Sequence, residues 1–166
     1  MKPLPWLFAL TVAALLRAAE PAPDPLEQQV AALVAGPQVT VVHFWAPWCP
    51  NCRAEMDPAA GWAKFIGANP EVKVVFLNIW HKGQKPDSRL AEAGLGTQPN
   101  LLLLNHPNPS RLEESRLTSF LGLPLTWIPA TWIYREGRLR VAFNYGEIRF
   151  DVLQQLVDDA RKEWKH

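Results

Sequence analysis

Cysteine is scarce in this chain of 166 residues, which contains only Cys49 and Cys52. With so few cysteines there is no framework of structural disulfides, so no other thiol competes for this pair. A structural zinc ion normally takes four ligands, often from a second pair of cysteines or histidines. The histidines lack such spacing and are scattered as His43, His81, His106 and His166. The two cysteines are therefore interpreted as a redox couple rather than as half of a zinc site.

An excess of charge of either sign is also missing. The chain has 17 Lys and Arg against 16 Asp and Glu, a net charge of +1, and the basic residues are dispersed. Nothing in this distribution indicates a nucleic-acid partner. The length suits one domain with a real core, and we expect a monomer.

The apolar stretch near the N-terminus is short. It runs over thirteen residues, 4–16, after Lys2, and this is too short for a typical transmembrane helix but suits an export signal. Arg17 stands where a small residue is preferred for cleavage after Ala19, so an uncleaved membrane anchor is the alternative. We predict a signal or anchor over 1–19, a proline-rich spacer over 20–25 and one domain over 26–166. Export would place the protein in the periplasm or outside the cell.

The two cysteines directly follow an apolar, β-branched run over 39–45 that is typical of a buried central strand. A helix is expected to begin at the pair, with Pro50 in its first turn. The free N–H groups and the positive dipole end of a helix start favour the thiolate of the first cysteine. Two intervening residues within one helical turn bring both sulfurs within bonding reach. This predicts that Cys49 attacks a partner disulfide and that Cys52 resolves the mixed disulfide.

Hydrophobic periodicity and turn residues predict the remaining elements. Four leucines over 101–104 fit either a strand or a buried helix. The other expected elements are a helix over 25–34, a strand over 39–45, a helix from 49 that bends at Pro58 and continues to 66, a strand over 72–79, a short helix over 86–93, a helix over 109–121, a hairpin over 131–143 and an amphipathic helix over 150–164.

This order, together with two motifs, resembles the thioredoxin-like superfamily. Residues 44–53 (FWAPWCPNCR) look like the thioredoxin signature, and residues 128–131 (IPAT) look like its cis-proline segment. Residues 52–55 (CRAE) further resemble the exported TlpA/ResA-like branch. The resemblance implies an α/β, three-layer fold with a central mixed β-sheet flanked by helices. It also implies an insertion over 80–124, before the cis-proline segment.

The resemblance suggests roles for further residues. It implies that Glu55, one helical turn after Cys52, exchanges a proton with that thiol; an ordinary exposed helix glutamate is the alternative. A cis Pro129 would present the backbone of Ile128 beside Cys49, where a substrate strand could pair. Trp48 is expected to form an exposed lip for partners.

Three further tryptophans and the loop after the second strand are expected to be structural. The tryptophans are Trp45, Trp127 and Trp132, which we expect in the core. Residues 80–82 are interpreted as a plain loop, with a contribution to the rim of the site as the alternative.

His43 occupies the place where thioredoxins carry a buried acid. A core histidine is the default interpretation, although its pKa range would allow a proton relay. Phe76 stands where thioredoxins place the lysine that partners that acid, so the usual buried ion pair is expected to be absent.

The predicted function is an exported thiol–disulfide oxidoreductase that needs no organic cofactor and reduces protein disulfides. Asn51 offers no positive charge to hold the Cys49 thiolate, which favours a reductase over an oxidant. Its partners would be proteins with disulfides and a membrane-bound electron donor. Two alternatives stay open: a copper-handling protein that uses both thiolates and a histidine, and a binding or adaptor module whose thiols are not catalytic.

Overall fold

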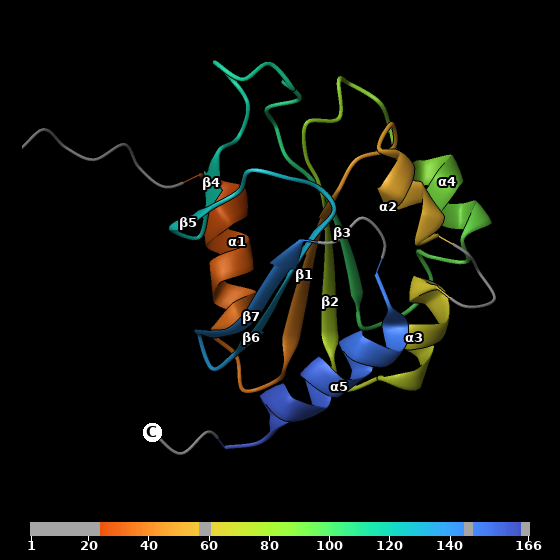
Figure 1. The fold of residues 1–166 in the computed structure, drawn as a ribbon, viewed down its shortest axis with the longest axis vertical. Helices are drawn as coiled ribbons and strands as arrows, with labels where there is room; N and C mark the ends of the chain where they lie inside the picture. The colour runs from red at the N-terminus through yellow and green to blue at the C-terminus, as the bar shows by residue number, and fades with distance from the viewer. Residues whose placement is uncertain (1–23, 57–60, 145–147, 164–166) are drawn as a thin grey trace, which may run out of the picture.

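The computed structural model describes residues 24–56, 61–144 and 148–163. These residues form five helices and seven strands, shown in Figure 1. In chain order they are α1 (Pro25–Val34), β1 (Thr40–Trp45), α2 (Pro50–Ala54), α3 (Trp62–Ala68), β2 (Lys73–Asn78), α4 (Asp87–Glu92), β3 (Leu101–Asn105), β4 (Ser119–Phe120), β5 (Leu123–Pro124), β6 (Ala130–Arg135), β7 (Arg138–Asn144) and α5 (Phe150–Arg161).

The central sheet is mixed and has the strand order β3-β2-β1-β6-β7. β1 and β2 pair in parallel, as do β2 and β3, whereas β6 is antiparallel to both β1 and β7. All six residues of β1 are buried, which is the pattern of a central strand covered on both faces. The first residues of β6 therefore lie beside the last residues of β1, with Ala130 opposite Phe44.

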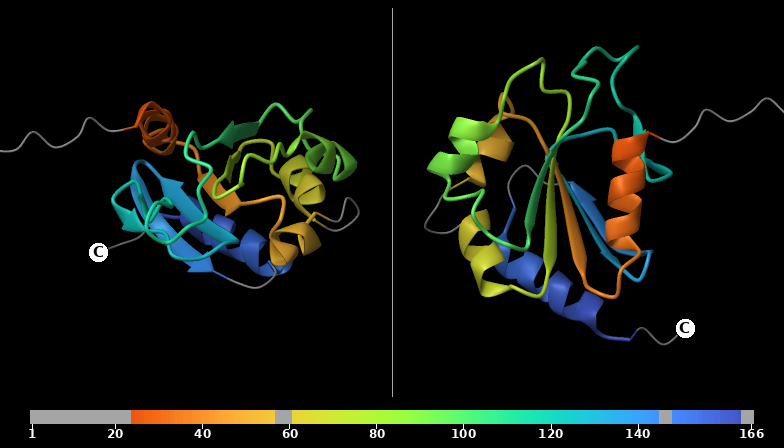
Figure 2. Two further views of the ribbon diagram at one scale, coloured as in Figure 1. Left: turned by 90° about the horizontal axis from the view of Figure 1, so that it is seen from above. Right: turned by 180° about the vertical axis from the view of Figure 1, so that it is seen from behind.

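Helices cover both faces of this sheet. Figures 1 and 2 show α1 on one face and α3 and α5 on the other. α5 is amphipathic: its buried residues Leu153, Val157 and Ala160 recur at helical spacing, and the helix packs against β6, β7 and α3. The three-layer arrangement of the thioredoxin-like fold is thereby confirmed.

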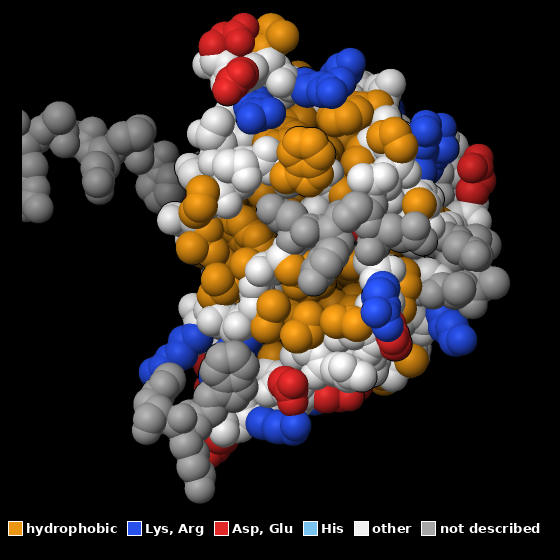
Figure 3. Space-filling view, viewed as in Figure 1, with side chains coloured by type: hydrophobic (Ala, Val, Ile, Leu, Met, Phe, Trp, Pro, Cys, Tyr) orange, Lys and Arg blue, Asp and Glu red, His pale blue; other side chains and the backbone are white. Residues whose placement is uncertain are grey.

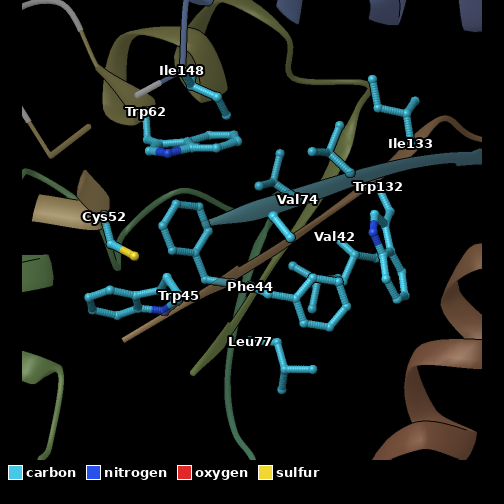
Figure 4. Packing of buried hydrophobic residues seen from close by; sticks show 14 of the residues in the cluster. Val42, Phe44, Trp45, Cys52, Trp62, Val74, Leu77, Trp132, Ile133 and Ile148 are labelled. Atoms are coloured by element: carbon cyan, nitrogen blue, oxygen red, sulfur yellow. The ribbon is translucent and has the colours of Figure 1, made fainter. Parts of the chain in front are cut away.

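Aromatic rings fill the core between the sheet and the helices. Trp62 of α3 packs edge to face against Phe76 of β2 and Phe150 of α5, with ring centroids 5.0 and 5.4 Å apart. Figure 4 shows the Cys52 sulfur pointing toward this apolar interior, on the side of Trp45. One of the two cysteines thus faces the core of the protein.

Most of the elements predicted from the sequence are present. α1 begins as expected, since the Asp24 carboxylate accepts a hydrogen bond from the Leu26 N–H at 2.7 Å and Pro25 occupies the first helical position. The four leucines form β3, which is an edge strand of the central sheet. The stretch over 80–124 therefore contributes a strand of the sheet as well as α4 and the β4-β5 ribbon.

The helix predicted over 109–121 is wrong. Side-chain oxygens of Asn108 and Ser110 accept hydrogen bonds from the N–H groups of Ser110 and Leu112, which stabilises turns instead of a helix. Leu112 is 64% exposed, whereas Phe120 is buried and Leu117 and Leu121 pack against the core, so the apolar residues of this stretch do not share one buried helical face. Its end forms β4, joined to β5 by a tight turn in which Leu121 and Gly122 both have positive φ.

Several sequence-based predictions fall outside the described residues. These are the signal or anchor over 1–19, the spacer up to residue 23, the helix bend at Pro58 and the C-terminal end of the last predicted helix. Within the described ranges, none of the helices has both the length and the apolar character that crossing a bilayer requires.

Candidate active site

Three chain segments meet at the end of the central sheet that is uppermost in Figure 1. β1 ends at Trp45 and leads to the cysteine pair at the start of α2. The parallel neighbour β2 ends at the same edge, where the Ile79 N–H donates to the Trp45 carbonyl at 3.0 Å. β6 runs antiparallel to β1, so the segment that precedes β6 returns to this edge. The topology alone thus brings residues 45–52, 79–82 and 126–129 together.

Cys49 and Cys52 are joined by a disulfide, with their Cα atoms 5.3 Å apart. Cys49 precedes α2, and its Sγ accepts a hydrogen bond from the Cys52 N–H at 3.3 Å. A donor at this position would stabilise negative charge on Cys49 when the disulfide is open. Cys52 is completely buried, whereas Cys49 keeps a small exposed fraction and lines a surface pocket. Only the first cysteine can therefore be reached by a large partner.

The peptide bond between Ile128 and Pro129 is cis. It lies in the segment just before β6 and places the Ile128 carbonyl oxygen 3.9 Å from the Cys49 Sγ. The structure thus brings together the two motifs that the sequence analysis singled out, although they are 79 positions apart.

Glu55 lies at the interior side of the pair. It follows α2 directly and is 1% exposed, which rules out the alternative of an ordinary exposed glutamate. Its carboxylate accepts hydrogen bonds from the Trp62 Nε1–H at 3.2 Å and from the Ile148 N–H at 3.1 Å. A buried carboxylate is costly unless donors of this kind compensate for the lost water.

His43 faces the same carboxylate from β1. Its Nε2 lies 3.3 Å from Glu55 Oε2, outside hydrogen-bond geometry, and its Nδ1 lies 3.0 Å from the Thr131 hydroxyl. Burial lowers the pKa of His43 to about 3, so the imidazole is neutral near pH 7.

Phe76 stands opposite His43 in the β1–β2 register, with ring centroids 4.9 Å apart. No lysine partner lies at that position, and His43 with Glu55 instead forms the buried polar pair behind the cysteines.

The outer wall of the site is built by two indoles. The Trp48 Nε1–H donates to the Trp80 carbonyl at 2.7 Å, and the Trp80 Nε1–H donates to the Leu117 carbonyl at 2.9 Å. Trp80 and Lys82 both have positive φ, which costs a non-glycine residue about 1–3 kcal/mol. The loop over 80–82 is thus held in a specific conformation at the rim of the site, and its interpretation as a plain loop was incomplete.

The prediction for Trp127 is wrong. Trp45 and Trp132 lie in the core as expected, but Trp127 is 61% exposed. It belongs to the segment between β5 and the cis-proline, in which Leu125 and Ile128 are buried while the side chain of Trp127 is exposed. Sequence reasoning could not separate these tryptophans, because a single Trp in a short connecting segment gives no periodicity from which burial can be judged.

A pocket of about 170 Å³ opens beside Cys49. Its walls include Trp48 and Trp80 on one side and Trp127 and Ile128 near the cis-proline, and Arg111 and Arg116 also contribute. No sequence pattern singles out the two arginines, which lie in the stretch that was predicted to be a helix. A larger cavity of about 370 Å³ lies elsewhere, near Leu33, Val74 and Leu101, and contains no cysteine.

Metal-binding side chains do not gather at this site. In the part of the chain that the structure describes, no group of three or more His, Cys, Asp and Glu residues could hold a metal ion. The copper-handling alternative therefore has no ligand set within those residues beyond the cysteine pair itself.

Comparison with solved structures identifies the fold. No protein-family model matches the chain, and no curated protein matches its sequence. A thiol-disulfide isomerase from Corynebacterium glutamicum superimposes with a TM-score of 0.55 and 20% identity, covering 80% of this chain and 86% of that one. A secreted Mycobacterium tuberculosis disulfide oxidoreductase, described as homologous to E. coli DsbE, gives 0.54 and 23%, covering 76% and 85%. StoA from Bacillus subtilis gives 0.50 and 20%, covering 73% and 83%. The chain has the thioredoxin-like fold.

Proposed function

We propose that this protein is an exported thiol–disulfide oxidoreductase that reduces disulfides in other proteins. The observation that carries the proposal is the pairing of its only two cysteines in a disulfide at a surface pocket, beside the cis Ile128–Pro129 bond. Solved structures with the same fold include proteins described as a disulfide oxidoreductase and a thiol-disulfide isomerase, which supports this class of reaction.

In the proposed reaction the protein starts as the dithiol. The Cys49 thiolate attacks one sulfur of the substrate disulfide, forms a mixed disulfide and releases the other substrate sulfur as a thiolate. Cys52 then loses its proton and attacks the Cys49 sulfur. The second substrate thiolate leaves, and the Cys49–Cys52 disulfide remains. The substrate gains two electrons and the protein loses two, so a second partner must restore the dithiol.

Glu55 is the proposed proton acceptor for Cys52. Both residues are buried on the interior side of α2, where bulk water does not reach either side chain. The Trp62 and Ile148 donors hold the carboxylate in place while it is charged. General-base assistance of this kind typically contributes about a hundredfold or more to a rate.

His43 is the proposed positioning residue for Glu55. A neutral imidazole carries one proton, on either Nδ1 or Nε2, and the Thr131 hydroxyl can donate or accept at Nδ1. After a small rotation of its ring, His43 could therefore present an N–H to the carboxylate form of Glu55 and a lone pair to its protonated form, since Nε2 lies 3.3 Å from Oε2 without a hydrogen bond in this structure. Both forms of the carboxyl would then have a neighbour of matching polarity inside the protein.

The proposed direction rests on the two residues between the cysteines, Pro50 and Asn51. Asn51 offers no positive charge to the thiolate, which favours a reductase over a strong oxidant. The apolar stretch over 4–16 supports export, and an oxidising compartment would require a membrane-bound electron donor to keep the pair reduced. We propose a monomer, with Trp48, Ile128 and Pro129 contacting the protein substrate.

The reduction potential of the Cys49–Cys52 couple tests the direction. The protein is equilibrated with dithiothreitol or glutathione buffers, and the fraction of disulfide is measured by alkylation and mass spectrometry. A reduction potential of about −270 mV, as in thioredoxin, is expected for a reductase, whereas a potential of about −120 mV would indicate a disulfide donor. Insulin reduction with dithiothreitol as the electron source tests the activity itself, and an inactive wild-type protein would overturn the proposal.

A further inference from the structure

The pocket beside Cys49 carries cationic side chains that form no ion pair with the residues the structure describes. Arg111 and Arg116 are among its lining residues, and no Asp or Glu side chain is. Neither guanidinium forms an ion pair within the described residues. Two positive charges at an accessible site, without an acidic partner among the described residues, favour an anionic ligand.

Each arginine lies over one of the two indoles that form the outer wall. The Arg111 Cζ is 4.0 Å from the centroid of the Trp48 ring, and the Arg116 Cζ is 4.8 Å from that of Trp80. The Lys82 Nζ lies 5.8 Å from the Trp48 ring. Stacking fixes the plane of a guanidinium while its edge N–H groups stay available, and this planar fork matches the geometry of a carboxylate.

Arg116 also has an unused donor. Its Nε is buried and has no hydrogen-bond partner within the described residues. Buried donors without a partner are rare in folded proteins and each one calls for an explanation. A ligand oxygen could meet this donor only after the Arg116 side chain turned outward, because the Nε itself is not exposed.

The acidic residues of the same loop lie elsewhere. Glu113 and Glu114 are exposed and do not line the pocket. Figure 3 shows acidic side chains at the upper extremity of the molecule, and Lys and Arg side chains beside the apolar area below it. The loop is therefore neutral as a whole but presents its positive charge toward Cys49.

The opposite wall suits an extended polypeptide. Trp127 offers an exposed indole there, and the Ile128 N–H has no acceptor within the described residues. The Ile128 carbonyl lies 3.9 Å from the Cys49 Sγ, so main chain that pairs with Ile128 would pass directly over the reactive sulfur.

We propose that this pocket selects an extended protein segment in which Asp or Glu residues flank the cysteine. The carboxylates bind at Arg111 and Arg116, an apolar side chain of the segment packs on Trp127, and its main chain pairs with Ile128. This inference rests on the proposed function and names the substrate class of that site. In the reaction the dithiol passes two electrons to the segment's disulfide, which becomes two thiols as the protein forms its own disulfide.

Binding is tested first, because it does not depend on redox activity. Three peptides of equal length carry serine in place of cysteine and differ only in their flanking residues, which are Glu, Gln or Lys. Titrations of the oxidised protein are followed by tryptophan fluorescence at low and high salt. We expect the Glu peptide to bind about tenfold more tightly than the Gln peptide, with a preference that salt reduces. Equal affinities for the three peptides would overturn the proposal.

Reduction rates of the wild type and of arginine variants test whether the preference for acidic peptides depends on Arg111. The cysteine forms of the peptides, as mixed disulfides with 2-mercaptoethanol, are reduced by the dithiol protein in a single turnover. Arg111→Glu is expected to reduce the Lys peptide faster than the Glu peptide, which reverses the wild-type order of rates. Arg111→Gln is expected to reduce the Glu and Gln peptides at similar rates. The matched control Arg89→Gln removes an exposed arginine of α4 and should keep the wild-type preference. If Arg89→Gln loses the preference equally, the effect is one of overall charge and the proposal fails.

Glutathione disulfide separates a polypeptide from a small anionic disulfide. Its reduction should depend less on Arg111 than that of the Glu peptide, because it has no apolar side chain to pack on Trp127 and no extended main chain to pair with Ile128. A loss as large as that of the Glu peptide would make this a site for low-molecular-weight disulfides and overturn the assignment. A protein that binds the Glu peptide selectively but reduces no disulfide would instead overturn the proposed function alone.

Discussion

The two sides of the Cys49–Cys52 disulfide differ sharply in solvent exposure and in the residues that surround them. On the outer side Cys49 borders a pocket with exposed Trp127 and the cation Arg111. On the inner side Cys52, Glu55 and His43 are buried and surrounded by aromatic rings. The two sulfurs belong to one helical turn, yet Cys49 borders a surface pocket and Cys52 meets only the protein.

This contrast separates two kinds of electrostatics. Charges on the outer side remain hydrated and are screened by salt, so they influence which partner binds and how quickly. Titratable groups on the inner side interact through a medium of low dielectric constant, where each change of protonation has a large free-energy effect. The outer residues are therefore suited to partner selection and the inner residues to proton transfer.

The largest expected effect follows from removing the outer sulfur. Cys49→Ser should lower the reduction of protein disulfides by at least about a thousandfold, because the chain has no other thiol that a partner can reach. Insulin reduction measures this loss.

The matched variant Cys52→Ser keeps the attacking sulfur and removes the resolving one. It should accumulate a mixed disulfide with the substrate, visible on a non-reducing gel. If Cys49→Ser also formed such an adduct, the assignment of the two roles would be reversed.

A smaller effect is expected from the inner carboxyl. Glu55→Gln keeps the volume of the side chain and an oxygen for the Ile148 N–H, but it removes the proton acceptor. Resolution of the mixed disulfide should slow by about a hundredfold near neutral pH, and this loss should shrink as rising pH ionises Cys52 directly. Rapid-quench measurement of the mixed disulfide's lifetime against pH tests this.

Alkylation of Cys49 by iodoacetamide serves as the control, since attack by the outer sulfur should be nearly unchanged in Glu55→Gln. An unchanged mixed-disulfide lifetime at every pH would show that Glu55 is only structural.

His43 links the inner side to the pH dependence of stability. Burial lowers its pKa from 6.5 to about 3, so between these values the unfolded chain binds a proton that the folded chain does not. The stabilising contribution is therefore complete above pH 6.5 and is lost as the pH falls toward 3. The free energy of unfolding should fall by up to about 1.4 kcal/mol per pH unit from this group.

Urea unfolding of wild type and His43→Asn, over a series of pH values, isolates that contribution. Asn retains a polar atom for Thr131 but does not titrate. Parallel stability curves for the two proteins would contradict the buried neutral state of His43.

The smallest of these effects concerns the outer wall. Trp48→Phe loses the hydrogen bond from Nε1 to the Trp80 carbonyl and should lower the free energy of unfolding by about 1 kcal/mol. The indole N–H of Trp127 forms no hydrogen bond within the described residues, so Trp127→Phe should change stability by less than about 0.5 kcal/mol. Equal losses in urea unfolding would mean that the Trp48–Trp80 bond does not hold the wall together.

The local parts of the site could be predicted from the sequence. The strand over 39–45, the helix start at Pro50 and the hairpin turn at Gly137 each depend on a few neighbouring residues. Such patterns carry their own physical signal, because backbone conformation responds to side-chain branching, proline and glycine within a few positions.

Contacts between residues that are distant in the chain were harder to predict from the sequence. The prediction left open whether Glu55 is exposed, and it did not pair Glu55 with His43, because their contact requires β1 and α2 to pack. For the same reason the sequence analysis placed Trp127 in the core and did not select Arg111 as a pocket residue, because both positions depend on how distant segments pack. A helix over 109–121 had the right apolar spacing, but side-chain hydrogen bonds at Asn108 and Ser110 favoured turns instead.

By itself the sequence determined the chemistry that is available: two thiols, their spacing, and the strand and helix that hold them. Tertiary structure alone decided which sulfur meets a partner, which carboxyl is buried behind it and which cations reach the pocket. The physical reason is that dielectric environment, and with it the free energy of a charge, depends on what surrounds a side chain from every direction. Most of those neighbours here come from segments far away in the chain.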